Sequence, residues 1–78
     1  MDRNKSINEE SISKMGIVVN CEKLNVRNEP DKNADIVQII DASSKVEISL
    51  NDSTDEFYKV YTETGMSGYC KKQYVNEI

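Results

Sequence analysis

The stretch Leu24-Asn25-Val26-Arg27-Asn28-Glu29-Pro30 decides the fold of this chain. Leu24 and Val26 alternate with polar neighbours, which predicts a short strand with one buried face. Pro30 has no backbone N–H to donate to a ladder, so the strand ends before it. The polar loop 28–35 then has no periodicity of its own, and loops of this length in small domains are often functional.

Further short strand patterns follow, separated by clusters of turn-forming residues. We expect strands over residues 17–21, 24–27, 36–40, 45–50, 56–62 and 67–70, a single 3₁₀ turn over 71–74, and a closing segment over 75–78. Parallel pairing needs long crossovers, which are not available here, so the pairing must be antiparallel. The sequence predicts an all-β domain, a small antiparallel barrel of five to six strands.

The first fifteen residues differ in character from the rest. They are polar, and Ser6 with Glu9 fits a capping box, which allows one or two helical turns over residues 7–14. We expect residues 1–15 to form a flexible or partly helical polar leader, and residues 16–78 to form the domain. The leader has no apolar run for a secretion signal and no segment could cross a bilayer, so we expect a cytoplasmic protein with no membrane contact. A cell-wall location would need another export route or a larger parent protein.

Four motifs occur in a fixed order. Leu24–Arg27 is followed by Pro30, then come Phe57-Tyr58-Lys59-Val60, Gly65-Met66-Ser67-Gly68-Tyr69 and finally Tyr74-Val75. In this order the chain resembles the bacterial SH3-like domains usually called SH3b (SH3_3 type). The resemblance implies an SH3-like barrel and a binding module that often accompanies cell-wall hydrolases.

Three positions depart from that family pattern. Phe57 and Tyr69 stand where the family often has tryptophan, which shrinks an aromatic ligand platform. Ser43 stands where a turn glycine is usual, so this turn either avoids positive φ or carries a small strain.

Catalysis has little support in the residues. The chain has no histidine, so it cannot form a Ser-His or Cys-His nucleophile pair. Metal-ligand, phosphate-loop and calcium-loop patterns are also missing, so we expect no cofactor and no metal. Its net charge is −4 and its 10 basic residues are scattered, which argues against nucleic acid as a partner.

The candidate ligand-binding residues come from the loop and from outward-facing aromatic rings: Asn28, Glu29, Asp31, Phe57, Tyr61 and Tyr69. Strand alternation places Tyr58 and Val60 on the core side, which leaves Phe57 and Tyr61 at or near the surface. An outward pair of rings could stack on a peptide or a sugar. The alternative is that these rings only cover a barrel too small to hide them.

The candidate structural residues are Leu24, Val26, Arg27, Pro30 and Gly68. Leu24 and Val26 are expected in the core. Arg27 could hold a ligand carboxylate, but we favour a structural role, in which it pairs with Glu29, Asp31 or Asp35 and bonds loop carbonyls. Cys21 and Cys70 are expected to be two buried thiols; the alternative disulfide requires Cα atoms within about 7 Å.

These observations favour a non-catalytic module that binds a protein or peptide through loop 28–35 and the outward aromatic rings. The loop is acidic, with Glu29, Asp31 and Asp35 against Lys32, so its partner should be neutral or basic. From the resemblance comes an alternative ligand, a peptidoglycan peptide, with the domain belonging to a larger or phage-related system. A third hypothesis is a self-associating assembly protein in which residues 1–15 order on a neighbouring subunit; the expected state is a monomer or weak homo-oligomer.

Overall fold

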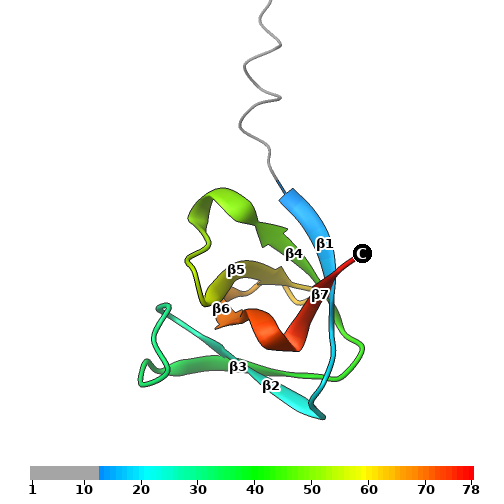
Figure 1. Cartoon of the computed structure of the whole chain (residues 1–78). Helices are drawn as coiled ribbons and strands as arrows, with labels where there is room; N and C mark the ends of the chain where they lie inside the picture. The colour runs from blue at the N-terminus through cyan, green and yellow to red at the C-terminus, as the bar shows by residue number, and fades with distance from the viewer. Residues whose placement is uncertain (1–12) are drawn as a thin grey trace, which may run out of the picture.

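One antiparallel sheet of seven strands organises residues 13–78, which are the residues that the computed structural model describes (Figure 1). The strands are β1 (Ser13–Val18), β2 (Lys23–Arg27), β3 (Ile36–Asp41), β4 (Lys45–Ser49), β5 (Phe57–Thr62), β6 (Ser67–Lys71) and β7 (Val75–Glu77), in the sheet order β3-β2-β6-β5-β4-β1-β7. The predicted all-β antiparallel fold is confirmed. The strand number is seven rather than five or six, because the closing segment forms its own strand against β1.

The core lies on the inner face of this curled sheet. Leu24 and Val26 of β2 are buried as predicted, with 5% and 0% of their surfaces exposed. Val46 and Ile48 of β4 and Val60 of β5 alternate with exposed or half-buried residues and are likewise buried. Burying each such side chain contributes about 1.5–3 kcal/mol relative to leaving it in water, so the alternating positions fix which face of each strand turns inward.

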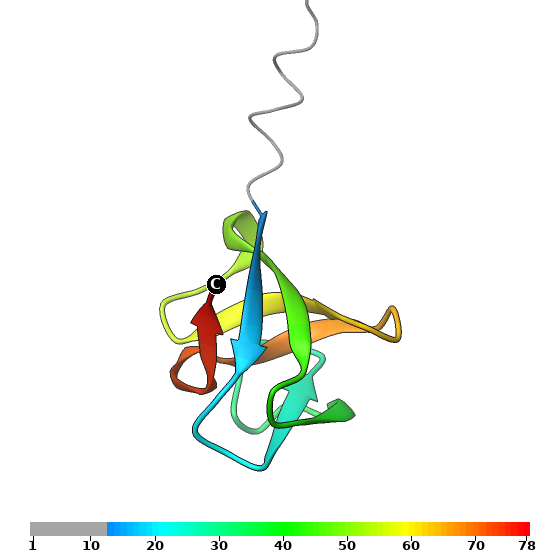
Figure 2. The same ribbon diagram turned by 90° about the vertical axis from the view of Figure 1, so that its right-hand side faces the viewer.

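Strand β1 begins earlier than the sequence predicts. Residues from Ser13 pair with β4, in the register Ser13↔Ser49 to Ile17↔Lys45, so the predicted boundary between leader and domain after Met15 is wrong. The strand also ends at Val18 instead of at Cys21. The reason is that β4 and β7 offer backbone partners on both sides of β1, and these do not depend on an apolar pattern (Figure 2). The remaining part of the predicted leader, residues 1–12, lies outside the described residues.

Two single-turn 3₁₀ helices complete the described part of the chain. η1 (Leu50–Asp52) follows β4, and η2 (Lys72–Tyr74) links β6 to β7. η2 confirms the turn predicted over residues 71–74. No helix within residues 13–78 has the length and apolar character to cross a membrane.

The turn between β3 and β4 settles the question raised by Ser43. Ser43 has φ 69°, so it occupies the left-handed region that favours glycine. The turn is closed by the Ser44 amide, which donates to the Asp41 carbonyl at 3.1 Å. Of the two expectations for this turn, the strained one is correct.

Strands β2 and β6 approach each other closely at Gly68. They pair at Arg27↔Tyr69, the position that joins the β2–β3 hairpin to the β5–β6 hairpin in the sheet. A Cβ atom on Gly68 would lie 2.5 Å from the Arg27 carbonyl oxygen and 2.6 Å from Val26 Cγ1. Glycine is required here because only a residue without a side chain allows this contact.

Loop 28–35 is internally bonded. The Asn28 amide donates to the Asp35 carbonyl at 2.9 Å, which closes the base of the loop. Within it, the Ala34 amide donates to the Asp31 carbonyl at 3.0 Å, and the Asn33 amide donates to the Asp31 carboxylate at 2.8 Å. The loop therefore has a defined shape, which it presents beside the start of β5.

Candidate ligand-binding groove

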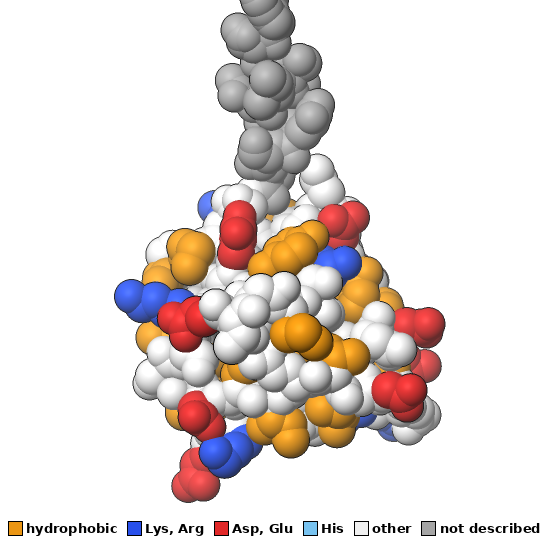
Figure 3. Space-filling model, turned by 180° about the vertical axis from the view of Figure 1, so that it is seen from behind, with side chains coloured by type: hydrophobic (Ala, Val, Ile, Leu, Met, Phe, Trp, Pro, Cys, Tyr) orange, Lys and Arg blue, Asp and Glu red, His pale blue; other side chains and the backbone are white. Residues whose placement is uncertain are grey.

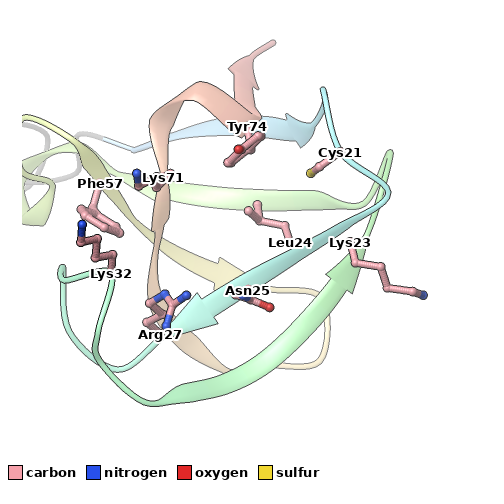
Figure 4. A pocket seen from close by; sticks show the side chains of 9 residues that line it. All are labelled: Cys21, Lys23, Leu24, Asn25, Arg27, Lys32, Phe57, Lys71 and Tyr74. Atoms are coloured by element: carbon pink, nitrogen blue, oxygen red, sulfur yellow. The ribbon is translucent and has the colours of Figure 1, made fainter.

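A groove of about 240 Å³ lies between β2, loop 28–35 and the segment from β6 to η2. It is lined by Cys21, Lys23, Leu24, Asn25, Arg27, Lys32, Phe57, Lys71 and Tyr74 (Figure 4). A second hollow of about 410 Å³ is lined by Pro30, Asp31, Lys32, Glu56, Phe57 and Lys71. Because the two hollows share Lys32, Phe57 and Lys71, they form one continuous groove, which we call the loop groove.

Phe57 is buried, which corrects the prediction that it faces outward at the surface. Only 4% of its surface is exposed, although it lies outside the main core cluster. Alternation places it on the outer face with Lys59, but loop 28–35 and the cross-strand neighbour Lys71 flank the ring there. Figure 4 shows the Phe57 ring beside the Lys32 and Lys71 side chains. The ring therefore forms part of the floor of the loop groove.

Hydrogen bonds from the preceding turn fix the start of β5. The Phe57 amide donates to the Thr54 hydroxyl at 3.1 Å, and the Thr54 amide donates to the Phe57 carbonyl at 2.8 Å. On the other side, the Lys72 amide donates to the Glu56 carbonyl at 3.0 Å. These bonds tie η2 to the strand that carries Phe57, so the groove wall does not depend on side chains alone.

Four cations line the inner part of the loop groove. Lys23 forms an ion pair with Asp41 at 2.7 Å, and Figure 4 shows its side chain extending away from the other lining residues. The Arg27 guanidinium donates from Nη1 to the Ala34 carbonyl at 2.8 Å. Lys32 and Lys71 form no ion pair with another described residue. The charge available to a ligand therefore lies on these two lysines, on either side of Phe57.

Arg27 bonds a carbonyl of loop 28–35, as the structural interpretation requires. The expected pairing with Glu29, Asp31 or Asp35 does not occur, since the ion pair found within residues 13–78 joins Lys23 and Asp41. Arg27 thus acts on the loop backbone at Ala34, which tethers the loop to the end of β2.

Tyr61 and Tyr69 lie on the outer face of β5 and β6. Lys59 Nζ stands between them, 5.8 Å from the centre of the Tyr61 ring and 5.1 Å from that of Tyr69. Tyr61 is 42% exposed, as predicted, and lines a separate hollow with Met15 and Glu47. We call these two rings and Lys59 the outer aromatic patch; its tyrosines do not line the loop groove.

The predicted site residues thus lie in three parts of the surface: the loop groove, the exposed side of loop 28–35 and the outer aromatic patch. Asp31 and Phe57 meet in the loop groove, whereas Asn28 and Glu29 are exposed on the loop without lining it. Sequence reasoning missed Lys32, Lys71 and Tyr74 as groove residues. A signal for Lys71 existed, because strand pairing places it opposite Phe57.

Acidic side chains are spread over one face of the domain and do not form a single patch there (Figure 3). On the face shown in Figure 3, acidic side chains lie at separate places around the rim, with hydrophobic groups in several small clusters between them. The outer end of the loop groove carries Asp31 and Glu56. Within residues 13–78, no group of three or more His, Cys, Asp or Glu residues could hold a metal ion.

Both cysteines are free thiols, so the disulfide alternative does not apply to this structure. Cys70 is buried in the core, and burial, with a smaller contribution from the charge of Cys21, raises its pKa to about 12. Cys21 is half-buried at the groove wall. The buried thiol is therefore neutral at physiological pH and behaves as a small apolar core residue.

Solved structures with a similar fold include NlpC2 and NlpC1 from Trichomonas vaginalis. The first matches with a TM-score of 0.69 at 21% identity, over 83% of this chain and 23% of that chain. For the second, the TM-score is 0.69 at 22% identity, over 83% of this chain and 22% of that chain. This chain thus spans less than a quarter of the length of either structure.

The comparison with curated protein sequences gives no match. The family model described as "Bacterial SH3 domain" matches residues 22–76, which include the Leu24–Arg27 motif, the three groove-lining lysines and η2. The chain therefore belongs to the bacterial SH3 domain family.

Proposed function

We propose that this bacterial SH3 domain is a non-catalytic module that binds a peptide in the loop groove. The observation that carries the proposal is the groove itself, in which Leu24, Phe57 and Tyr74 provide apolar surface between flanking polar side chains. Ligand sites commonly combine apolar surface with polar groups that orient the ligand. In the outer aromatic patch, by contrast, the Tyr61 ring is exposed to solvent.

The groove walls are ordered before any ligand binds. Loop 28–35 is closed by the bond between Asn28 and Asp35 and is tethered by Arg27, while η2 is bonded to the start of β5. A preformed site loses less conformational entropy on binding than one that must order its loops. This supports recognition of a short extended segment without rearrangement of the domain.

The first test is an amide-shift titration of the ¹⁵N-labelled chain with solubilised muropeptides. These are the first probe because the resemblance to SH3b domains implies contact with peptidoglycan peptides. We expect shifts at Leu24, Lys71 and Tyr74, with little change at Tyr61. A titration that moves Tyr61 and Tyr69 instead would transfer the site to the outer aromatic patch, and a flat titration would refute muropeptide binding.

A matched pair of variants sharpens this test. Tyr74→Ala removes apolar surface from the groove, and Tyr61→Ala removes a ring of the same kind from the outer patch. We expect the first to weaken binding by at least fivefold, since tyrosine is enriched among the contact residues whose truncation costs more than about 1 kcal/mol. Tyr61→Ala should leave affinity unchanged. The opposite ranking would contradict the proposal.

Self-association is a second candidate function, favoured by one observation. β3 is an end strand of the sheet formed by residues 13–78, and it carries Ile36 and Ile39 with 46% and 54% of their surfaces exposed. Exposed apolar end strands can pair with a second copy. Sedimentation over a range of concentrations tests this: Ile39→Lys should abolish any dimer, and a wild-type chain that stays monomeric at millimolar concentration would exclude this function.

A further inference from the structure

The inner part of the loop groove is basic in an acidic protein. The chain carries a net charge of −4, yet its groove of about 240 Å³ is lined by Lys23, Arg27, Lys32 and Lys71 and by no Asp or Glu. A cleft lined by one sign of charge concentrates ligands of the opposite sign. The groove therefore favours anionic ligands, although the net charge of the chain is negative.

Two of these cations are already engaged and two are available. Lys23 pairs with Asp41, and Arg27 donates one guanidinium hydrogen bond to the Ala34 carbonyl. Lys32 and Lys71 have no ion pair within residues 13–78. They lie beside Phe57 from different elements, loop 28–35 and β6 (Figure 4). An anionic group placed between these two side chains would be attracted by both ammonium groups.

We propose that the loop groove recognises a free carboxylate on the bound peptide, with Lys32 and Lys71 as its anchors. This inference rests on the proposed peptide-binding function and adds the chemical class of the ligand. The carboxylate lies between the two lysines, and the apolar part of the same residue packs toward Phe57. A lysine ammonium group is a compact charge without the fixed fork of a guanidinium. Two lysines therefore discriminate ligands mainly by their negative charge and less by the geometry of the anionic group.

The carboxyl groups near the groove favour one orientation of the bound peptide. Asp31 and Glu56 line only the outer part, where they share Lys32, Lys71 and Phe57 with the inner part. A ligand carboxylate is therefore favoured on the inner side, toward Tyr74, and a neutral or positive segment is favoured toward Asp31. The acidic loop alone predicts a neutral or basic partner, but the groove reverses this expectation for the residue that enters it.

The test compares two forms of one probe, a peptidoglycan stem pentapeptide whose other carboxylates are all amidated and whose C-terminal carboxylate is free, and the same peptide as its C-terminal amide. Dissociation constants are measured by amide-shift titration of the full chain. We expect the carboxylate form to bind about fivefold more tightly at low salt, as partly exposed ion pairs contribute up to about 1 kcal/mol each. This preference should shrink at 0.5 M salt, where screening is strong.

Two charge-neutralising variants complete the design. Lys32→Gln and Lys71→Gln should each reduce the difference between carboxylate and amide, while Lys45→Gln, which removes a lysine that lines neither part of the loop groove, should retain it. Equal affinity for both peptides would overturn the carboxylate inference and leave the peptide-binding function standing. Tighter binding of the amide would also overturn it, and binding of neither peptide would refute both proposals.

Discussion

Replacing Gly68 by alanine should destabilise the domain where β2 and β6 pair. The added Cβ would lie 2.5 Å from the Arg27 carbonyl oxygen and 2.6 Å from Val26 Cγ1. To reach an ordinary contact of 3.4 Å, the β2 backbone must retreat by about 0.9 Å. The Arg27 carbonyl is part of the backbone and the Val26 side chain is fully buried, so neither group can rotate away from the added Cβ. Overpacking of this kind typically costs about 1–3 kcal/mol, and a backbone clash belongs at the upper end.

A loss of about 3 kcal/mol is a large fraction of the stability of a small domain, which is about 0.05–0.15 kcal/mol per residue. We expect the melting temperature, followed by far-ultraviolet circular dichroism, to fall by at least 10 °C, since about 1 kcal/mol shifts it by 4–8 °C in a domain of this size.

Gly65→Ala is the matched control for the Gly68 variant. Its Cβ would have no neighbour within 4 Å, but the residue has φ +91°, so only backbone strain of about 1–2 kcal/mol applies. If Gly68→Ala melts at the wild-type temperature, or higher than Gly65→Ala, the argument from close approach is wrong.

Three further predictions concern other parts of the domain. Arg27→Met removes the bond to the Ala34 carbonyl, so hydrogen exchange of the loop amides should accelerate several-fold while the β4 and β5 amides keep their protection; unchanged loop exchange would contradict the tether. Thr62→Val deletes the buried hydroxyl that donates to Gln38 Oε1 at 2.8 Å, and urea unfolding should show a loss of about 1–2 kcal/mol, whereas a neutral effect would mean that this network does not stabilise the core. Burial raises the pKa of Cys70 to about 12 from 9.0, so between these pH values the native state keeps a proton that the unfolded state loses, and the free energy of unfolding should fall as pH rises from 9 toward 12. Cys70→Ala should make the free energy of unfolding less dependent on pH in this range, and an unchanged dependence would refute the prediction.

Strand patterns with strict alternation were predictable from the sequence. In β4, Val46 and Ile48 alternate with exposed neighbours and are buried as predicted, although the strand ends at Ser49, one residue before its predicted end. Leu24 and Val26 are likewise buried in the core, as predicted. In these cases one residue pattern determines both the strand and its inner face, because a shift of one position would expose every apolar side chain.

The start of β1 could not be predicted from such patterns. Ser13, Lys14 and Met15 have no apolar alternation, and all three are exposed. They form a strand because β4 extends to Ser49 and provides backbone partners along its whole length. Hydrogen bonding of this kind depends on the neighbouring strand and leaves little trace in the local sequence. Boundaries set by tertiary pairing are therefore the part of the fold that sequence reasoning places least well.

The candidate site departs from expectation for a related reason. Alternation correctly assigned Phe57 and Tyr61 to the same side of β5, but it gave no information about what lies over that side. Loop 28–35 and Lys71 flank Phe57, while Tyr61, four residues further along, remains in solvent. One strand face thus carries both a groove floor and an exposed ring. The net charge misleads in the same way: the acidic loop points most of its carboxylates outward, and Lys32, its only basic residue, lines the groove. What the domain offers a ligand is therefore decided by how the loop folds over the sheet, which neither strand periodicity nor composition encodes.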